Sequence, residues 1–94
     1  MPELSLLTNH ARVLVCIARD GEMRLRDIAA ALDLTERRVF GIVSDLTVGG
    51  WVVKEKAGRR NHYLIQADVR VSELVTREVT IGEVLKVLIG SPDA

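Results

Sequence analysis

The sequence predicts a mainly α-helical fold with a small β-hairpin: a three-helix core, a two-stranded wing and a C-terminal helix. Two observations lead to this fold class. Apolar residues recur at helical spacing in three successive stretches between residues 9 and 48. Two short runs rich in β-branched and aromatic residues then follow, with a glycine-containing turn between them, which is the pattern of a β-hairpin. The expected order is therefore a helix-turn-helix followed by a wing.

The first helix is expected to begin at Thr8 or Asn9, either of which can cap it, and to end near Arg19 before the turn pair at residues 20–21. Its centre is apolar nearly all round. One stripe consists of Val13, Cys16 and Ile17, and the opposite side carries Ala11, Val15 and Ala18. A surface helix needs only one apolar face, so the second face must meet another element. Two alternatives stay open, which are packing against the C-terminal segment and a contact between subunits.

The second helix is expected over about residues 24–32, and residues 33–35 form the turn. Thr35 is placed to cap a third helix from Glu36 to about Val48, which the pair at residues 49–50 ends. The expected inward residues are Leu25, Ile28, Ala29 and Leu32 in the second helix and Val39, Ile42, Val43 and Leu46 in the third.

Residues 51–56 and 62–65 read as paired strands joined by residues 57–61, and residues 67–79 as an extended or irregular linker. Thr80 and Glu83 match a capping box for a short helix that ends near Ile89 and is stopped by residues 90–92. One face of this helix would carry Ile81, Val84, Leu85 and Leu88. The expected division is a DNA-binding unit over 1–66, and a linker with a packing or dimerisation helix over 67–94.

The length of 94 residues supports one compact domain, and the aromatic share of 3% means that Leu, Ile, Val and Ala must build the core. No apolar run is long enough to span a bilayer, and the N-terminus lacks the pattern of a secretion signal. The single cysteine, Cys16, cannot form an internal disulfide, which agrees with a reducing compartment. We therefore expect a cytoplasmic protein, associated with the nucleoid when bound to DNA.

The formal net charge is zero, but the charges are distributed unevenly along the chain. Residues 1–34 carry a net charge of −1, residues 35–62 a net charge of +3, and residues 63–94 a net charge of −2. The positive excess coincides with the third helix and the hairpin, and local asymmetry of this kind favours a polyanionic partner. Because the excess is small, we expect modest affinity per subunit and a need for dimerisation.

The candidate DNA contacts lie on the third helix and on the hairpin. If Val39 is the centre of the buried side of the third helix, Arg37 and Arg38 point outward, and an outward arginine can bond guanine. Gly41, in the middle of the helix, would allow a partner to approach closely. Alternating lysines point to one side of the hairpin, and its tip can reach phosphates or a minor groove. The candidates are Thr35, Arg37, Arg38, Gly41, Ser44, Lys54, Lys56, Arg59, Arg60 and Asn61.

The stretch from Ile28 to Val39, then Ile42, Leu46, Gly50 and the run Gly58-Arg59-Arg60-Asn61-His62-Tyr63, resembles a MarR-type winged-helix transcriptional regulator, specifically a short bacterial form with a Gly-Arg-Arg-Asn-x-Tyr wing. The resemblance covers about residues 6–66. It implies a homodimer that reads a short palindrome, with recognition-helix positions at Thr35, Arg37, Arg38 and Ser44 and wing positions at Arg59 and Arg60. Two departures are an Ala57-Gly58 pair where that wing carries an acid, and the lack of the long flanking helices that form the family's effector pocket.

Other classes of function find little support in the residues. His10, His62 and Cys16 have no metal-ligand spacing, and no catalytic motif or phosphate-binding glycine loop occurs, so we expect neither an enzyme nor a cofactor nor a metal. Trp51 and Tyr63 are expected to pack against the domain. The alternative function is a winged-helix module that binds another protein and no DNA.

The sequence thus predicts a sequence-specific regulator, by default a repressor, that binds double-stranded DNA as a homodimer, with no small-molecule ligand and no membrane association. The first and C-terminal helices would hold the dimer. The expected interface residues are Ala11, Val15, Ala18, Val84, Leu85 and Leu88.

Overall fold

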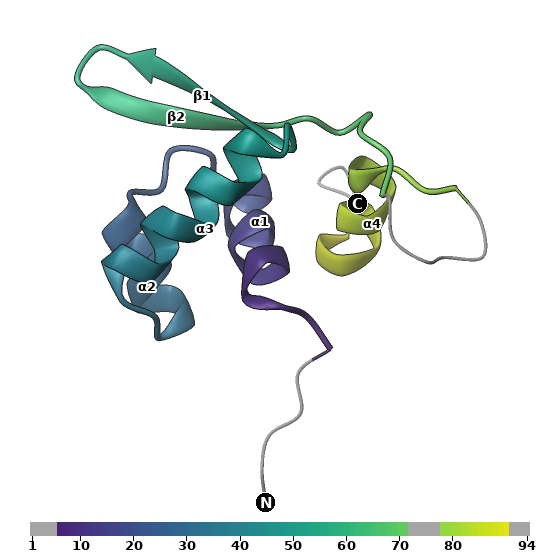
Figure 1. The fold of residues 1–94 in the computed structure, drawn as a ribbon, viewed down its shortest axis with the longest axis horizontal. Helices are drawn as coiled ribbons and strands as arrows, with labels where there is room; N and C mark the ends of the chain where they lie inside the picture. Colours follow the sequence, from purple (N-terminus) through teal and green to yellow (C-terminus); the bar gives the residue numbers. More distant parts are fainter. Residues whose placement is uncertain (1–5, 72–77, 91–94) are drawn as a thin grey trace, which may run out of the picture.

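The computed structural model describes residues 6–71 and 78–90, and within them four helices and one hairpin follow in the predicted order (Figure 1). The hairpin extends from the end of α3 over the group formed by α1, α2 and α3, and α4 lies on the other side of α1 (Figure 1). The predicted fold class, a winged helix-turn-helix with a C-terminal helix, is confirmed. The elements are α1 (Asn9–Arg19), α2 (Leu25–Leu32), α3 (Glu36–Val48), β1 (Val52–Ala57), β2 (Arg60–Ile65) and α4 (Ile81–Ile89).

Three threonine caps fix the starts of α1, α3 and α4, as predicted. The Thr8 hydroxyl accepts a hydrogen bond from the Ala11 N–H at 3.1 Å, and the Thr35 hydroxyl accepts one from the Arg38 N–H at 3.0 Å. At α4 the capping box is complete, because the Glu83 N–H donates to Thr80 and the Thr80 N–H donates to the Glu83 carboxylate. Each cap satisfies N–H groups that have no partner within the helix.

The end of α3 sets the direction in which the chain enters the wing. Gly49 keeps helical backbone angles, and Gly50 takes the left-handed conformation with φ of 82°. The Gly50 N–H donates to the Thr47 carbonyl and the Trp51 N–H donates to the Leu46 carbonyl at 3.0 Å, which is the Schellman pattern. The second glycine, rather than the pair as a whole, therefore provides the turn out of the helix.

One hydrophobic core joins all the elements. The predicted α3 stripe is confirmed, since its four residues are buried, and α4 contributes to the same core. In α1 the buried residues are Val13, Leu14 and Ile17, whereas Cys16 is half-buried. Leu14 therefore takes the place in the buried stripe that the prediction gave to Cys16. The fully buried or nearly buried residues from the remaining elements are Ile28, Ala29, Val52, Tyr63, Ile81 and Leu85.

The hairpin is longer and its turn tighter than predicted. The register pairs Ala57 with Arg60, so only Gly58 and Arg59 form the connection, and Gly58 has φ of 67°. A two-residue turn with a positive φ matches the twist of antiparallel strands. Arg60 and Asn61 consequently belong to β2, and the prediction that they lie in the turn beside Arg59 was wrong.

The segment between α1 and α2 lies against β2 and supports the wing. The Tyr63 N–H donates to the Gly21 carbonyl at 2.9 Å, and the Arg60 Nη2 donates to the Glu22 carbonyl at 2.8 Å. The approach at Gly21 is so close that an added Cβ would overlap the Tyr63 carbonyl oxygen. The wing is therefore fixed both at its base and along one edge.

The predicted irregular linker is partly ordered by short antiparallel pairing. Arg70 pairs with Thr80, the Val71 N–H donates to the Val79 carbonyl at 2.9 Å, and the Ile81 N–H donates to the Val69 carbonyl at 2.8 Å. This pairing ties the start of α4 to the chain that leaves the hairpin. The remainder of that predicted linker, residues 72–77, and the helix stop at residues 91–92 lie outside the described residues.

Replacing Gly21 with alanine is expected to destabilise the protein by about 1–3 kcal/mol, because the new methyl group displaces the backbone of β2. Urea unfolding followed by circular dichroism measures the change. The matched control is Gly41→Ala, which places the same methyl group in open space and should stabilise by about 0.5–1 kcal/mol. Equal stability of the wild type and Gly21→Ala would contradict the close approach.

Candidate functional site

The outward face of α3 has two flanks that differ in their neighbours. At about 100° per residue, Arg37, Gly41 and Val48 point away from the buried Val39, whereas Phe40 and Arg38 lie on opposite flanks. Arg37, Arg38 and Thr35 are exposed, and Ser44 is half-buried. Of the two arginines predicted to face outward, only Arg37 lies near the centre of the exposed face.

The flank of Arg38 is the one that faces α1. On this side Asp45 Oδ2 lies 2.8 Å from His10 Nε2, so a ring N–H of α1 can donate to a carboxylate of α3. The His10 side chain is partly exposed and the Asp45 side chain mostly exposed to solvent, so the contact contributes on the order of 0–1 kcal/mol to stability. It nevertheless holds Asp45, one of the two acidic residues of α3, away from the opposite flank.

The opposite flank of α3 and the wing enclose a hollow of about 190 Å³. Phe40, Ser44 and Val48, spaced by one helical turn, line it from α3, and Lys54 lines it from β1. A second hollow of about 320 Å³ lies beside it, between the start of α2 and the hairpin tip. Leu25 and Tyr63 line both hollows, so the two form one continuous surface, which we call the concave surface.

Basic side chains surround the second hollow. Arg24 contributes from the residue before α2, and Arg59, Arg60 and Asn61 contribute from the hairpin. Arg59 is exposed in the turn, whereas part of the Arg60 guanidinium is engaged with the Glu22 carbonyl. Arg60 thus has a structural role in addition to its charge.

The two faces of the hairpin differ in charge. Because directly paired residues share a face, Lys54 and Lys56 lie with Val52 and Tyr63 on the side that packs against the helices. Glu55 lies on the other face, where His62 pairs with it. The register therefore directs the two lysines toward the concave surface and the glutamate away from it.

Sequence reasoning missed Arg24 and Phe40 among the residues of the concave surface. Arg24 was assigned to the second helix, but its extended backbone makes it the residue before α2 and brings it to the hairpin tip. Phe40 is 63% exposed. It falls outside the buried stripe of α3, and an aromatic residue off the stripe is a signal that the helical spacing could have revealed.

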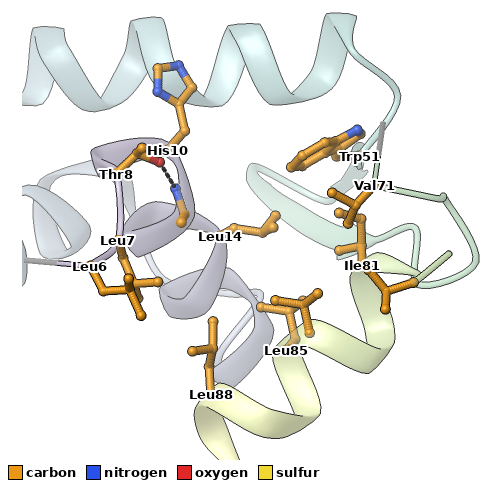
Figure 2. Close-up of a pocket in the computed structure, with 13 residues that line it drawn as sticks. Leu6, Leu7, Thr8, His10, Leu14, Trp51, Val71, Ile81, Leu85 and Leu88 are labelled. Atoms are coloured by element: carbon orange, nitrogen blue, oxygen red, sulfur yellow. Dashed lines mark hydrogen bonds between the residues drawn. The ribbon is translucent and has the colours of Figure 1, made fainter. Parts of the chain in front are cut away.

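An apolar cavity of about 380 Å³ lies between parts of α1 and α4 (Figure 2). Leu14 lines it from α1, Leu85 and Leu88 from α4, and the Trp51 ring from the segment between α3 and β1 (Figure 2). The cavity was not anticipated from the sequence. Trp51 is half-buried against the core, as predicted.

The residues predicted for a dimer interface divide between this cavity and the core. Four of them line the cavity, namely Ala11, Val84, Leu85 and Leu88. Leu85 is only 5% exposed, so its side chain belongs to the contact between α1 and α4 within one chain. Val15 and Ala18 are partly buried against the core. Of the second face of α1, Ala11 therefore lines the cavity that α4 borders, whereas Val15 and Ala18 pack against the core.

Cys16 is half-buried, and this burial raises the pKa of its thiol, an effect that the nearby Arg19 and Arg12 oppose more weakly. A raised pKa lowers the thiolate fraction at neutral pH and so disfavours reactivity. Over residues 6–71 and 78–90, no group of three or more His, Cys, Asp or Glu side chains is arranged to hold a metal ion. In the same residues, no helix is long and apolar enough to cross a membrane.

Residues 6–66 match a family described as a domain of unknown function (DUF7343). The chain belongs to this family. No curated protein shows a significant match to its sequence. Among solved structures it is similar to CymR, the global cysteine regulator of B. subtilis, with 23% sequence identity, a TM-score of 0.49, and coverage of 95% of this chain and 67% of that chain. The winged-helix fold expected from the MarR resemblance is confirmed, and the narrower assignment to MarR-type regulators stays a prediction.

Proposed function

We propose that this DUF7343 protein binds double-stranded DNA through the concave surface and the outward face of α3, and that it regulates transcription by occluding promoters. The observation that carries the proposal is the continuity of the concave surface, which joins the exposed flank of α3 to the basic residues of the wing. An α-helix fits the major groove of B-DNA, and a basic hairpin beside it can contact the adjacent phosphates.

Within this proposal the residues have different tasks. Arg37 extends from the first turn of α3 and bonds guanine, and Ser44 bonds a base edge or a phosphate. Lys54, Lys56 and Arg59 contact phosphates along the wing, and Arg24 extends this basic line to the start of α2. The predicted contacts Thr35, Arg38, Arg60 and Asn61 flank these residues. Thr35 also fixes the start of α3 through its cap.

Dimerisation is the second part of the proposal. A twofold dimer would place two α3 helices in successive major grooves, about 34–36 Å apart, and so read a palindrome. Support comes from α4, where Val87 is 84% exposed and Val84 and Leu88 are more than one-third exposed beside the apolar cavity. An exposed apolar patch of this kind is typical of a contact between proteins.

A second candidate function is the binding of another protein at the concave surface. The exposed fractions of Phe40 and Val48, 63% and 89%, favour this alternative because apolar anchors are common in protein interfaces. The basic residues from α2, β1 and the hairpin tip favour DNA. Salt dependence separates the two, since each phosphate contact releases counterions.

The DNA proposal predicts that the protein binds random duplex at about 50 mM salt and loses affinity steeply as salt rises. Fluorescence anisotropy with a labelled duplex measures this. Arg59→Ala should reduce the slope of log K against log salt by about one. The matched control is Lys86→Ala on α4, which removes the same charge far from the concave surface and should leave the slope unchanged. Failure of the wild type to bind any duplex at that salt would overturn the proposal.

Gly41→Ala is expected to have opposite effects on folding and on DNA binding. The Cβ meets nothing within 4 Å among the described residues, so the folded protein gains about 0.5–1 kcal/mol. If α3 lies in the major groove, the added methyl group occupies the space of the DNA and weakens the complex. A Tm measurement and an anisotropy titration on the same preparation test both effects. A stabilised variant with unchanged DNA affinity would place Gly41 outside the interface.

Leu88→Glu is expected to give a folded monomer, because it introduces a charge into the apolar patch of α4. Analytical ultracentrifugation reports the oligomeric state, and circular dichroism reports the fold. The control is Leu64→Glu on the outer face of the wing, where Leu64 is as exposed as Leu88, and it should leave the dimer intact. A folded dimer in the Leu88→Glu variant would rule out this patch as the interface.

A further inference from the structure

The chain contains three aromatic residues of the Phe, Trp and Tyr types, and they differ in how much of each side chain is exposed to solvent. Tyr63 is buried in the core, and Trp51 is half-buried against it. Phe40 is the exception, because 63% of its surface remains exposed on the flank of α3 that faces the wing. Burying a phenylalanine side chain contributes about 1.5–3 kcal/mol, and the fold does not use this contribution at Phe40, so the ring is available to a partner.

The surroundings of Phe40 indicate what kind of partner covers it. Ser44 lies one turn further along α3 in the same row, and Lys54 lines the opposite wall of the same hollow. Arg37 precedes Phe40 by three residues, on the outward side of the helix. Of the two acidic residues of α3, Asp45 is on the other flank, next to His10, and Glu36 lies one turn before Phe40 in the first turn of the helix. A partner that combines negative charge with a small apolar group fits this arrangement.

Gly41 clears the space beside the ring. A Cβ at this position would meet nothing within 4 Å among the described residues, so packing within the domain does not require a glycine here. The absence of a side chain next to Phe40 allows a rigid surface to approach the helix backbone while the ring remains extended. This geometry suits the rigid edge of a base in a groove. The side chains of a protein partner could move to accommodate a larger residue and would not need a glycine here.

We propose that Phe40 is a specificity-determining residue that contacts the C5-methyl group of a thymine in the major groove. This methyl group is the apolar feature of the base edges, and contact with phenylalanine is one of the ways in which proteins recognise it. The inference rests on the proposed DNA binding and adds a base preference to it. Three residues span about 4.5 Å along a helix, so the thymine lies within one or two base pairs of the guanine read by Arg37.

The test uses deoxyuridine, which differs from thymidine only in lacking the C5-methyl group. A bound duplex is first selected from a random pool, and each thymine of one half-site is then replaced in turn. The wild type is expected to lose about fourfold in affinity at one position, which corresponds to burial of one methyl-sized group worth about 0.8 kcal/mol. Phe40→Ala should bind the thymidine and deoxyuridine duplexes equally, and Phe40→Leu should retain most of the preference.

The matched control is Val87→Ala, which shortens an exposed apolar side chain on α4 and should keep the full thymidine preference. Equal wild-type affinity for all the duplexes, with DNA binding intact, overturns the inference and leaves the proposed function standing. Retention of the preference in Phe40→Ala also overturns it. If the wild type binds no duplex at about 50 mM salt, both the function and this inference fail. Should Phe40→Ala bind too weakly for titration, the wild-type series and Phe40→Leu still decide.

Discussion

The attachment of the wing to the segment between α1 and α2 is the constraint on which the candidate site depends. A two-stranded hairpin is marginally stable by itself in water. Here Tyr63 anchors it in two ways, since its side chain is buried in the core and its N–H donates to the Gly21 carbonyl. Without this attachment the hairpin would be held at its base alone, and the two hollows that share Leu25 and Tyr63 would not form one surface.

Helix α3 must satisfy two demands at once. Its buried stripe, Val39, Ile42, Val43 and Leu46, contributes more residues to the core than any other element, so the helix cannot rotate without loss of packing. The opposite side carries Phe40, Gly41 and Val48, none of which the core requires. Rigid burial on one side thus holds the exposed side in a defined orientation, which is what recognition of a groove demands.

Much of the architecture could be predicted from local patterns. The bounds of α1, α3 and α4 follow from threonine caps, glycine stops and apolar spacing, and the structure has them where these signals placed them. The hairpin was predicted with too long a turn, because the pattern of Arg60 and Asn61 is equally compatible with a strand and a loop. Only the pairing of Ala57 with Arg60 decides between them, and that is a tertiary fact.

The site was predictable in its charges and less so in its shape. Lys54 and Arg59, which the sequence predicted from strand alternation and from the hairpin turn, line the concave surface, but the approach of Arg24 to the hairpin tip depends on how α2 packs under the wing. The cavity between α1 and α4 was missed for the same reason. The apolar residues of α1 and α4 predict that these helices pack against something. They do not show whether that packing is complete or leaves a cavity.

The way in which the hairpin is held has a mechanical consequence. The chain enters it at Trp51, whose N–H closes α3, and leaves it at Gln66, whose N–H donates to the Trp51 carbonyl at 2.8 Å, so the base acts as a clamp. Six residues of strand make an arm of about 20 Å, and a tilt of about 10° at the clamp moves the tip by about 3.5 Å. That displacement equals about the rise per phosphate of one DNA strand along the helix axis. The hydrogen bond from Arg60 to the Glu22 carbonyl, close to the tip, opposes this tilt and so limits the displacement of Arg59.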